Sequence, residues 1–276
     1  MNAYNNIVTL KRRMDLSSTS GQGWNDADLR ILLEAASRQI DIYCNRFFYV
    51  DEQTWYFDGA ASPMWLPDIL VVSTFKLDED SDATFESTLT EDTDFALYPL
   101  NTYPKWEAAV LTQGDYGSFA SGIKKGVEIT ATFGYGDGIS ATPYSDSGNN
   151  VQDDPLSSSA TTIAVTDGTL FGAGQTLRIE SEQVYILSIS SNTLTVTRAV
   201  NGTTAASHVQ DTDIYIYDYP RPIMEAALIQ AMRWYKRRET AFQDSVITEI
   251  GQIVSYKGLD PDIALIVSKY AKMGIG

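Results

Sequence analysis

The sequence is poor in the side chains that most often build metal and nucleophilic sites, with one cysteine, Cys44, and one histidine, His208. A lone cysteine cannot form an internal disulfide, and a zinc site of cysteine and histidine ligands is excluded because too few such ligands exist. A Ser-His-Asp triad would have to use His208, and no GxSxG-type nucleophile elbow is present. We therefore predict no catalytic residue, no cofactor and no metal, a non-enzymatic protein, and His208 as a surface turn residue.

Basic residues and long apolar runs are also scarce. The chain has 20 Lys and Arg against 36 Asp and Glu, a net charge of −16. Such a surface repels nucleic acid and anionic lipid. No run of about 18 apolar residues occurs, so no transmembrane helix is expected. The first residues, MNAYNNIVTLKRR, lack the apolar core of a signal peptide, and we expect synthesis in a reducing cytosol.

The 276 residues are 43% hydrophobic, enough for one large domain or two smaller ones. The most regular stretch is 25–48, where apolar residues recur at offsets of three and four, as on one face of a helix. Asn25 is a good N-cap, and Asp26 and Asp28 place negative charge in the first turn. This helix needs a partner to cover its apolar face.

The stretch 219–245 is predicted to be that partner. It has Pro222 in its first turn and is apolar almost all round through Tyr235, which is typical of a helix buried on more than one side. We expect it to pack against 25–48. The apolar segment 259–273, opened by Pro261, docks either on its own domain or on a neighbouring molecule.

The rest of the chain favours strands. Between 49 and 137 the strand-like stretches are QTWYFDG, MWLPDILVVSTFKLD, DFALYPL, AAVLT and GVEITATFGYGD. We expect the helix at 25–48 to cover the last of these. Residues 138–158 have linker composition. After them, TTIAVTD, GQTLRIESE, QVYILSIS, NTLTVTRAV and DTDIYIYDY are five strands of a compact module at 155–217.

The predicted fold class is α+β: a helical adaptor core with a small antiparallel sheet, plus an inserted all-β module, a small barrel or sandwich. Residues 1–150 and 218–276 would form the adaptor domain, and 151–217 the inserted module.

Asp78, Asp80 and Asp82 resemble the start of a calcium-binding EF-hand loop. That loop needs glycine at position six and glutamate at position twelve, where this chain has Ala83 and Leu89. A solvated acidic loop is the favoured interpretation.

A local reversal of charge marks the candidate partner surface. Arg233, Lys236, Arg237 and Arg238 cluster in a strongly acidic chain. One explanation is structural: cations are favourable near a helix C-terminus, and long basic side chains extend to solvent from a buried helix. The other is functional: the cluster contacts an acidic partner or DNA phosphate. The candidate interface residues are Arg233, Lys236, Arg237, Arg238, Ile263, Leu265, Ile266 and Tyr270.

The order of these elements resembles the head–tail connector (adaptor) proteins of tailed bacteriophages. The resemblance rests on DLRILLEAASRQIDIYCNRF, WYFDG, LPDILVVSTFKLD, DFALYP, Trp106, VEITATFGYGD and PIMEAALIQAMRWYKRRE, in that order. It covers most of 7–136 and 219–240. The stretch 155–217 also resembles a small β-module of phage structural proteins. That module and the long tail after Asp244 depart from a minimal connector.

The resemblance implies a structural protein of the virion neck, made in the host cytoplasm. It would form a homo-oligomeric ring, twelve-fold or near it, that joins the portal protein to a tail-completion or tail-terminator protein. DNA would pass through the ring without specific binding. Two alternatives stay open: a carbohydrate-binding or tail adhesion protein that uses the β-module with Trp55, Trp65 and Trp106, and a hydrolase that uses Asp/Glu pairs.

Overall fold

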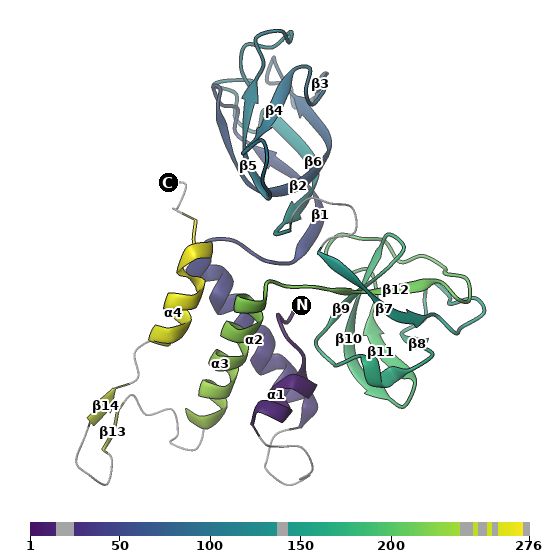
Figure 1. Cartoon of the computed structure of the whole chain (residues 1–276). Helices are drawn as coiled ribbons and strands as arrows, with labels where there is room; N and C mark the ends of the chain where they lie inside the picture. The colour runs from purple at the N-terminus through teal and green to yellow at the C-terminus, as the bar shows by residue number, and fades with distance from the viewer. Residues whose placement is uncertain (15–24, 137–142, 238–244, 248–252, 256–258, 273–276) are drawn as a thin grey trace. The chain divides into compact units, whose positions relative to one another are not determined.

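The computed structural model describes residues 1–14, 25–136, 143–237, 245–247, 253–255 and 259–272. The chain divides into two compact units (Figure 1). The first contains Met1–Asn45, Tyr144–Val200 and Thr204–Met273, and the second contains Arg46–Pro143 with Asn201–Thr203. The helices are thus grouped with the later strands, whereas the sequence analysis grouped them with the earlier ones.

The predicted fold class is wrong. The described part of the chain is mostly β, with two antiparallel sheets of six strands each and four short α-helices, and it has no helical adaptor core. The physical reason lies in the second unit, whose sheet covers its own apolar face and therefore needs no helix.

The second unit consists of one sheet in the order β1-β6-β2-β5-β4, with β3 paired to β2. The strands are β1 (Val50–Phe57), β2 (Met64–Leu77), β3 (Ser87–Leu89), β4 (Phe95–Tyr98), β5 (Lys105–Val110) and β6 (Val127–Gly134). All of them except β3 match the strands expected from alternation between 49 and 137. Strand β2 changes register between Trp65 and Ile69 and again between Val72 and Thr74. Such irregularities bend a strand, and they allow β2 to pair with three neighbours.

The core of the second unit comes from these strands and the loops between them. Val127, Ile129, Ala131 and Phe133 of β6 point into it, as the alternation predicts. Phe75 lies at the centre, with its ring centroid 4.8 Å from that of Phe95 and 5.2 Å from that of Phe119. Helix 25–48 was expected to pack on this face of β6. Side chains of the second unit itself pack there instead.

The first unit contains the four helices. They are α1 (Ile7–Arg13), α2 (Asp26–Cys44), α3 (Arg221–Arg237) and α4 (Pro261–Val267), the last followed by a 3-10 turn, Ser268–Tyr270. The Asn25 side chain caps α2 by accepting from Asp28 N at 2.9 Å, as predicted. Asn45 ends α2 in the left-handed conformation, with φ 50°.

The predicted pairing of the two long helices is confirmed for the described residues. α3 packs against α2, and it also contacts α1 and α4. The stripe of α2 is fully buried at Leu33, Ala36 and Ile40. α3 is buried on several sides, as its nearly continuous apolar sequence predicted. Two distant segments of the chain therefore form one helical layer.

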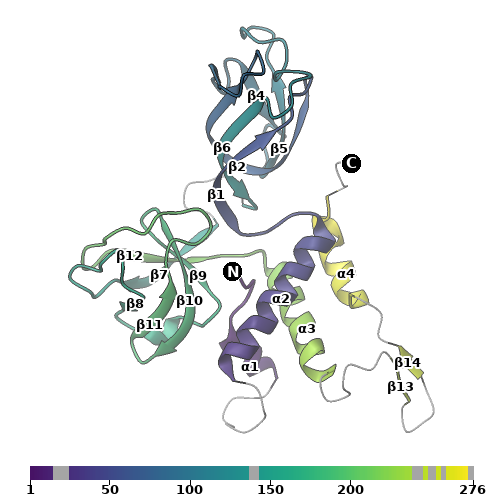
Figure 2. The same cartoon turned by 180° about the vertical axis from the view of Figure 1, so that it is seen from behind.

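The sheet of the first unit has the order β7-β12-β9-β10-β11-β8 (Figure 2). Its strands are β7 (Tyr144–Asn150), β8 (Thr162–Ala164), β9 (Thr176–Ile179), β10 (Glu182–Ser190), β11 (Thr193–Thr197) and β12 (Asp213–Tyr217), with a 3-10 turn at Gly168–Leu170. The five strands expected in 155–217 are confirmed. A short hairpin, β13 (Ser245–Ile247) and β14 (Ile253–Ser255), lies between α3 and α4 in the chain.

Residues 144–150, which were expected in a linker, form edge strand β7 instead. Its polar side chains form hydrogen bonds that support the pairing of this strand. Asn149 is buried, accepts from Thr166 N at 2.9 Å, and donates to Asp167 O at 2.7 Å. An edge strand of this kind has no apolar alternation for a sequence pattern to detect.

Direct bonds join the helices to this sheet within the first unit. Ile7 N, at the start of α1, donates to Ala173 O at 3.0 Å. The Tyr185 hydroxyl on β10 donates to Glu34 of α2 at 2.6 Å. Burial, together with the negative charge of Glu34, raises the pKa of the Tyr185 hydroxyl, so it remains a donor. These contacts fix one side of the helical layer against the sheet.

Candidate functional site

The predicted basic cluster is only in part available to a partner. Arg233 forms an ion pair with Asp260, Nη1 to Oδ2, at 3.1 Å, and both side chains are mostly buried. Lys236 is exposed and Arg237 is half-buried. Arg238 lies outside the described residues. Arg233 therefore links α3 to the start of α4 within the same chain, a role that sequence reasoning missed.

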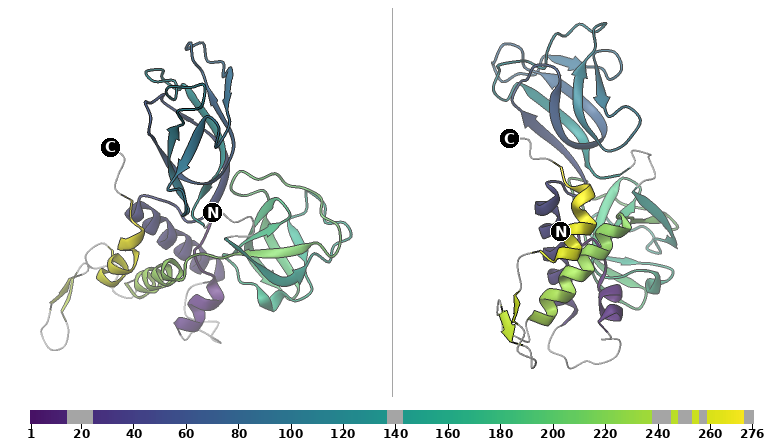
Figure 3. Two further views of the ribbon diagram at one scale, coloured as in Figure 1. Left: turned by 45° about the horizontal axis from the view of Figure 1, so that its top comes forward. Right: turned by 60° about the vertical axis from the view of Figure 1, so that its left-hand side comes forward.

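The apolar C-terminal segment folds onto its own chain. Ile263 and Val267 are fully buried, and α4 packs on α3 (Figure 3, right). Lys272 N donates to Cys44 O at 2.8 Å, which brings the end of the segment to the end of α2. Of the two alternatives left open for 259–273, the described part of this segment docks on its own chain, and the candidate interface residue Ile263 is buried there.

One apolar side chain of α4 is nevertheless left in solvent. Leu265 is 78% exposed, on the helix face opposite Ile263, while Ile266 and Tyr270 are half-buried. At the adjoining end of α2, Ile42 is 82% exposed. We call Leu265 and Ile42, together with half-exposed Tyr43, the α2–α4 edge. Contiguous exposed apolar residues are typical of contact surfaces, whereas isolated ones are common everywhere.

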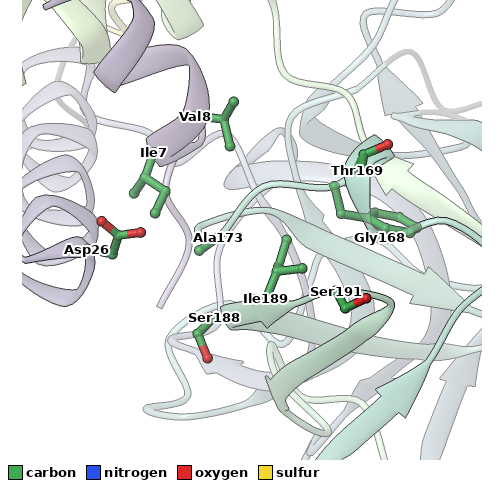
Figure 4. Close-up of a pocket in the computed structure, with 10 residues that line it drawn as sticks. Ile7, Val8, Asp26, Gly168, Thr169, Ala173, Ser188, Ile189 and Ser191 are labelled. Carbon is green, nitrogen blue, oxygen red and sulfur yellow. The ribbon is translucent and has the colours of Figure 1, made fainter. Parts of the chain in front are cut away.

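A cavity of about 370 Å³ lies in the first unit, where α1 and the start of α2 meet the sheet (Figure 4). Its lining is mostly apolar. Ile7 and Val8 come from α1, Phe171 and Ala173 from the loop before β9, and Ile189 from β10. The volume lies at the small end of the range for ligand pockets, roughly 300–1,000 Å³. No sequence motif marked it, because its residues come from four separate segments.

Charge at the rim of the cavity comes from the first turn of α2. Asp26 lines the cavity and forms an ion pair with Lys11 of α1. Asp28 is exposed two residues further along. Together with the exposed Ser188 of β10, they give the apolar cavity a polar, partly acidic rim.

His208 is buried, and its prediction as a surface turn residue is wrong. Its Nδ1 lies 2.7 Å from Oε2 of Glu180, and its Nε2 lies 2.9 Å from Oε2 of Glu182. Arg198 approaches both oxygens of Glu182, each at 2.6 Å. We call Glu180, Glu182, Arg198 and His208 the His208 network.

The His208 network holds a loop and has the character of a structural site. Glu182 is fully buried and also accepts from Ala199 N at 3.1 Å and Ala206 N at 3.0 Å. Burial raises the pKa of the Glu182 carboxyl, but the bonds from Arg198, Ala206 and His208 outweigh it, and the pKa lies below its usual value. Every carboxylate oxygen of Glu182 is occupied by the chain itself, so the network offers no open position for a substrate.

The acidic loop brings four carboxylates together. One oxygen from each of Asp78, Asp80, Asp82 and Glu86 lies within 4.8 Å of the others. Asp78 is buried, but both its oxygens accept backbone bonds, from Ser81 N at 2.7 Å and Ala83 N at 2.9 Å. Hydrogen bonds from its own backbone thus close the loop around Asp78.

The three tryptophans proposed as sugar platforms lie in the second unit and not in the β-module. Trp55 stacks on Phe133 at 4.4 Å. Trp65 is 53% exposed and pairs with Glu107, so the two share a face of the sheet. Trp106, the residue before Glu107, points to the opposite face. The three rings therefore do not form one exposed strip.

Among the described residues, no helix has the length and apolar content needed to cross a bilayer. No protein-family model matches the chain, and no curated protein matches it in sequence.

Proposed function

We propose that this protein is a structural component of the neck of a tailed bacteriophage. It assembles into a homo-oligomeric ring of about twelve copies between the portal protein and a tail-completion or tail-terminator protein, and DNA passes through the ring. The proposal starts from the order of sequence motifs described above. The observation that carries it is the α2–α4 edge, where Leu265 of the docked helix α4 and Ile42 near the end of α2 are both exposed.

Rigidity of the α2–α4 edge supports an assembly role. α4 is held by the buried side chains of Ile263 and Val267, by the Arg233–Asp260 pair, and by the bond from Lys272 N to Cys44 O. The backbone at Leu265 is thereby held in one position. Pre-organised apolar contacts lose little conformational freedom on association, and they favour specific interfaces.

The charge of the chain suits a DNA conduit. A ring of about twelve copies, each of net charge −16, carries a large negative charge. Cationic linings hold DNA by its phosphates, whereas an acidic lining repels them. DNA would then move through the ring without a binding step.

Negative-stain electron microscopy of the purified full-length chain tests the proposal. We expect annular particles with a central hole. A uniform field of single particles of monomer size, at every protein concentration tried, would reject the neck-ring function.

A further inference from the structure

We infer that the hairpin of β13 and β14, which we call the arm, adds to the outer edge of β1 in a neighbouring copy of this chain. This inference rests on the proposed ring and names a second contact within it, besides the α2–α4 edge. The contact is heterologous, since the arm and the receiving edge are different surfaces, and contacts of this type generate closed rings.

The arm is a sheet of only two strands. Val246 pairs with Val254 at its centre, and in the described part of the chain neither strand pairs with any other element. An isolated two-stranded hairpin is at best marginally stable in water, and its outer edges carry unpaired N–H and C=O groups. The strands are rich in β-branched residues, which favour a place in a sheet. The arm would therefore gain stability by joining a larger sheet.

The chain around the arm is long enough to reach a neighbour. The Arg233–Asp260 ion pair holds the start of α4 beside α3, so residues 238–259 leave the helical layer and return to it near the same place. Half of that stretch, roughly 11 residues, spans at most about 36 Å. A domain of roughly 150 residues has a radius of gyration of only about 15 Å. The arm can thus extend beyond the surface of its own unit.

The receiving strand, β1, lies at the edge of its sheet because it pairs only with β6. On the side away from β6, Glu52 N donates to O of Asn201, a residue that belongs to the same unit, at 2.9 Å. Bonding direction alternates along an antiparallel strand, so the N–H and C=O groups of Thr54 and Tyr56 point to that side as well. Among the described residues, none donates to or accepts from these four groups.

Arm and edge match in length and in chemistry. Thr54 and Tyr56 present two donors and two acceptors over three residues of β1, and each strand of the arm is three residues long. Thr54 is exposed and Tyr56 is 48% exposed, so the edge is accessible there. Addition of a strand satisfies backbone groups on both partners, and these main-chain bonds supply the affinity. The bond between Glu52 and Asn201 limits the addition to the part of β1 that begins at Thr54.

Hydrogen exchange, measured on the wild-type assembly and on the diluted single chain, tests this contact. The amides of Thr54 and Tyr56 should exchange about tenfold or more slowly in the assembly. The matched variant replaces 245–255 by glycine and serine of equal length, which keeps the reach of the chain and removes the strands. In its assemblies the two amides should exchange at the single-chain rate. Unchanged exchange in the wild-type assembly, or slow exchange that persists without the arm, would overturn the contact and leave the ring standing.

A pair of substitutions at Thr54 tests the edge from the other side. Thr54→Pro removes one outward N–H and should fold, since an edge strand tolerates proline where its N–H faces solvent. Thr54→Val is the matched control, because both substitutions remove the hydroxyl that bonds to Thr130 Oγ1 at 2.8 Å but only valine keeps the N–H. By mass photometry, T54P should need about tenfold more protein than T54V to form rings. Equal requirements would overturn the contact, whereas a wild-type chain that never assembles would overturn the proposed function.

A photo-cross-linker identifies the partner of β1 even if the chain without the arm does not assemble. Benzoylphenylalanine replaces Tyr56, and assemblies mixed from isotope-labelled and unlabelled chains are irradiated. Mass spectrometry should find position 56 of one copy joined to the segment 245–255 of another, with both labels in one product. Products with a single label would show the arm on β1 of its own chain. That result, or cross-links to any other segment, would overturn the contact.

Discussion

Arg233 on α3 and Asp260 at the start of α4 form an ion pair of 3.1 Å, and Asp260 also caps α4 by accepting from Asp262 N at 2.9 Å. Asp260→Asn removes the charge but keeps a good N-cap. In a double-mutant cycle with Arg233→Gln, we expect a coupling free energy of about 1 kcal/mol, measured by urea unfolding. A coupling energy near zero would mean that the pair does not hold α4.

Docking of α4 should also protect Cys44, whose Sγ lies 3.8 Å from Val267 O. Ile263→Ala removes a fully buried side chain of α4 and should accelerate labelling of Cys44 by a thiol reagent at least several-fold. Ile31→Ala is the matched control on α2 and should leave the labelling rate unchanged, because Ile31 is exposed and lies outside both the cavity and the α2–α4 edge. Equal rates in the two variants would contradict the docked position of α4.

Glu182 should be the most sensitive polar position of the first unit. Glu182→Gln leaves Arg198 buried without its charged partner, and we expect a loss of about 3–5 kcal/mol in unfolding free energy. Glu180→Gln alters the same network at a side chain that is 60% exposed, and should have a much smaller effect. Since the pKa of Glu182 is lowered by folding, its contribution is present at neutral pH and is lost as the pH falls. Thermal unfolding of both variants and the wild type at neutral and acidic pH measures these stability differences.

Asp41 on α2 should have the opposite effect to Glu182 on the pH dependence of stability. Burial raises its pKa from 3.8 to about 7, although Arg38 and the hydroxyl of Tyr4 oppose the shift. The folded state then binds more protons than the unfolded state, so Asp41 weakens the fold as the pH rises from 3.8 to about 7. Asp41→Asn should remove that part of the pH dependence. Parallel stability curves for the variant and the wild type through this range would show that the Asp41 carboxyl is not shifted.

Local patterns predicted the elements better than their assembly. The stripe of residues 29–47 and the dense apolar run after Pro222 identified α2 and α3. In each case the apolar side chains that form the pattern are the ones that burial removes from water. The prediction that a helix covers the β6 face was wrong. That face is covered through the bends of β2 and the positions of Phe95 and Phe119, which depend on pairing between distant segments. Such pairing between distant segments leaves no periodic pattern in the sequence.

The candidate site shows the same limit. His208 looked like a surface residue because its neighbours in the chain are polar, yet its partners, Glu180 and Glu182, lie in the turn between β9 and β10 and at the start of β10. A charged residue at Glu182, directly before an apolar strand, was the signal that could have indicated a buried network. Arg233 was identified as unusual, but its partner Asp260 lies 27 residues away. The cavity had no signal, since its lining residues are ordinary in sequence.

The proposed closed ring, formed through the α2–α4 edge, is best tested by the mass of the wild-type assembly. Native mass spectrometry should give one dominant species near twelve times 30.5 kDa, and Leu265→Glu should reduce it to the single-chain mass. A wild-type chain found at 30.5 kDa across micromolar concentrations, or a Leu265→Glu variant that retains the large assembly, would contradict the account.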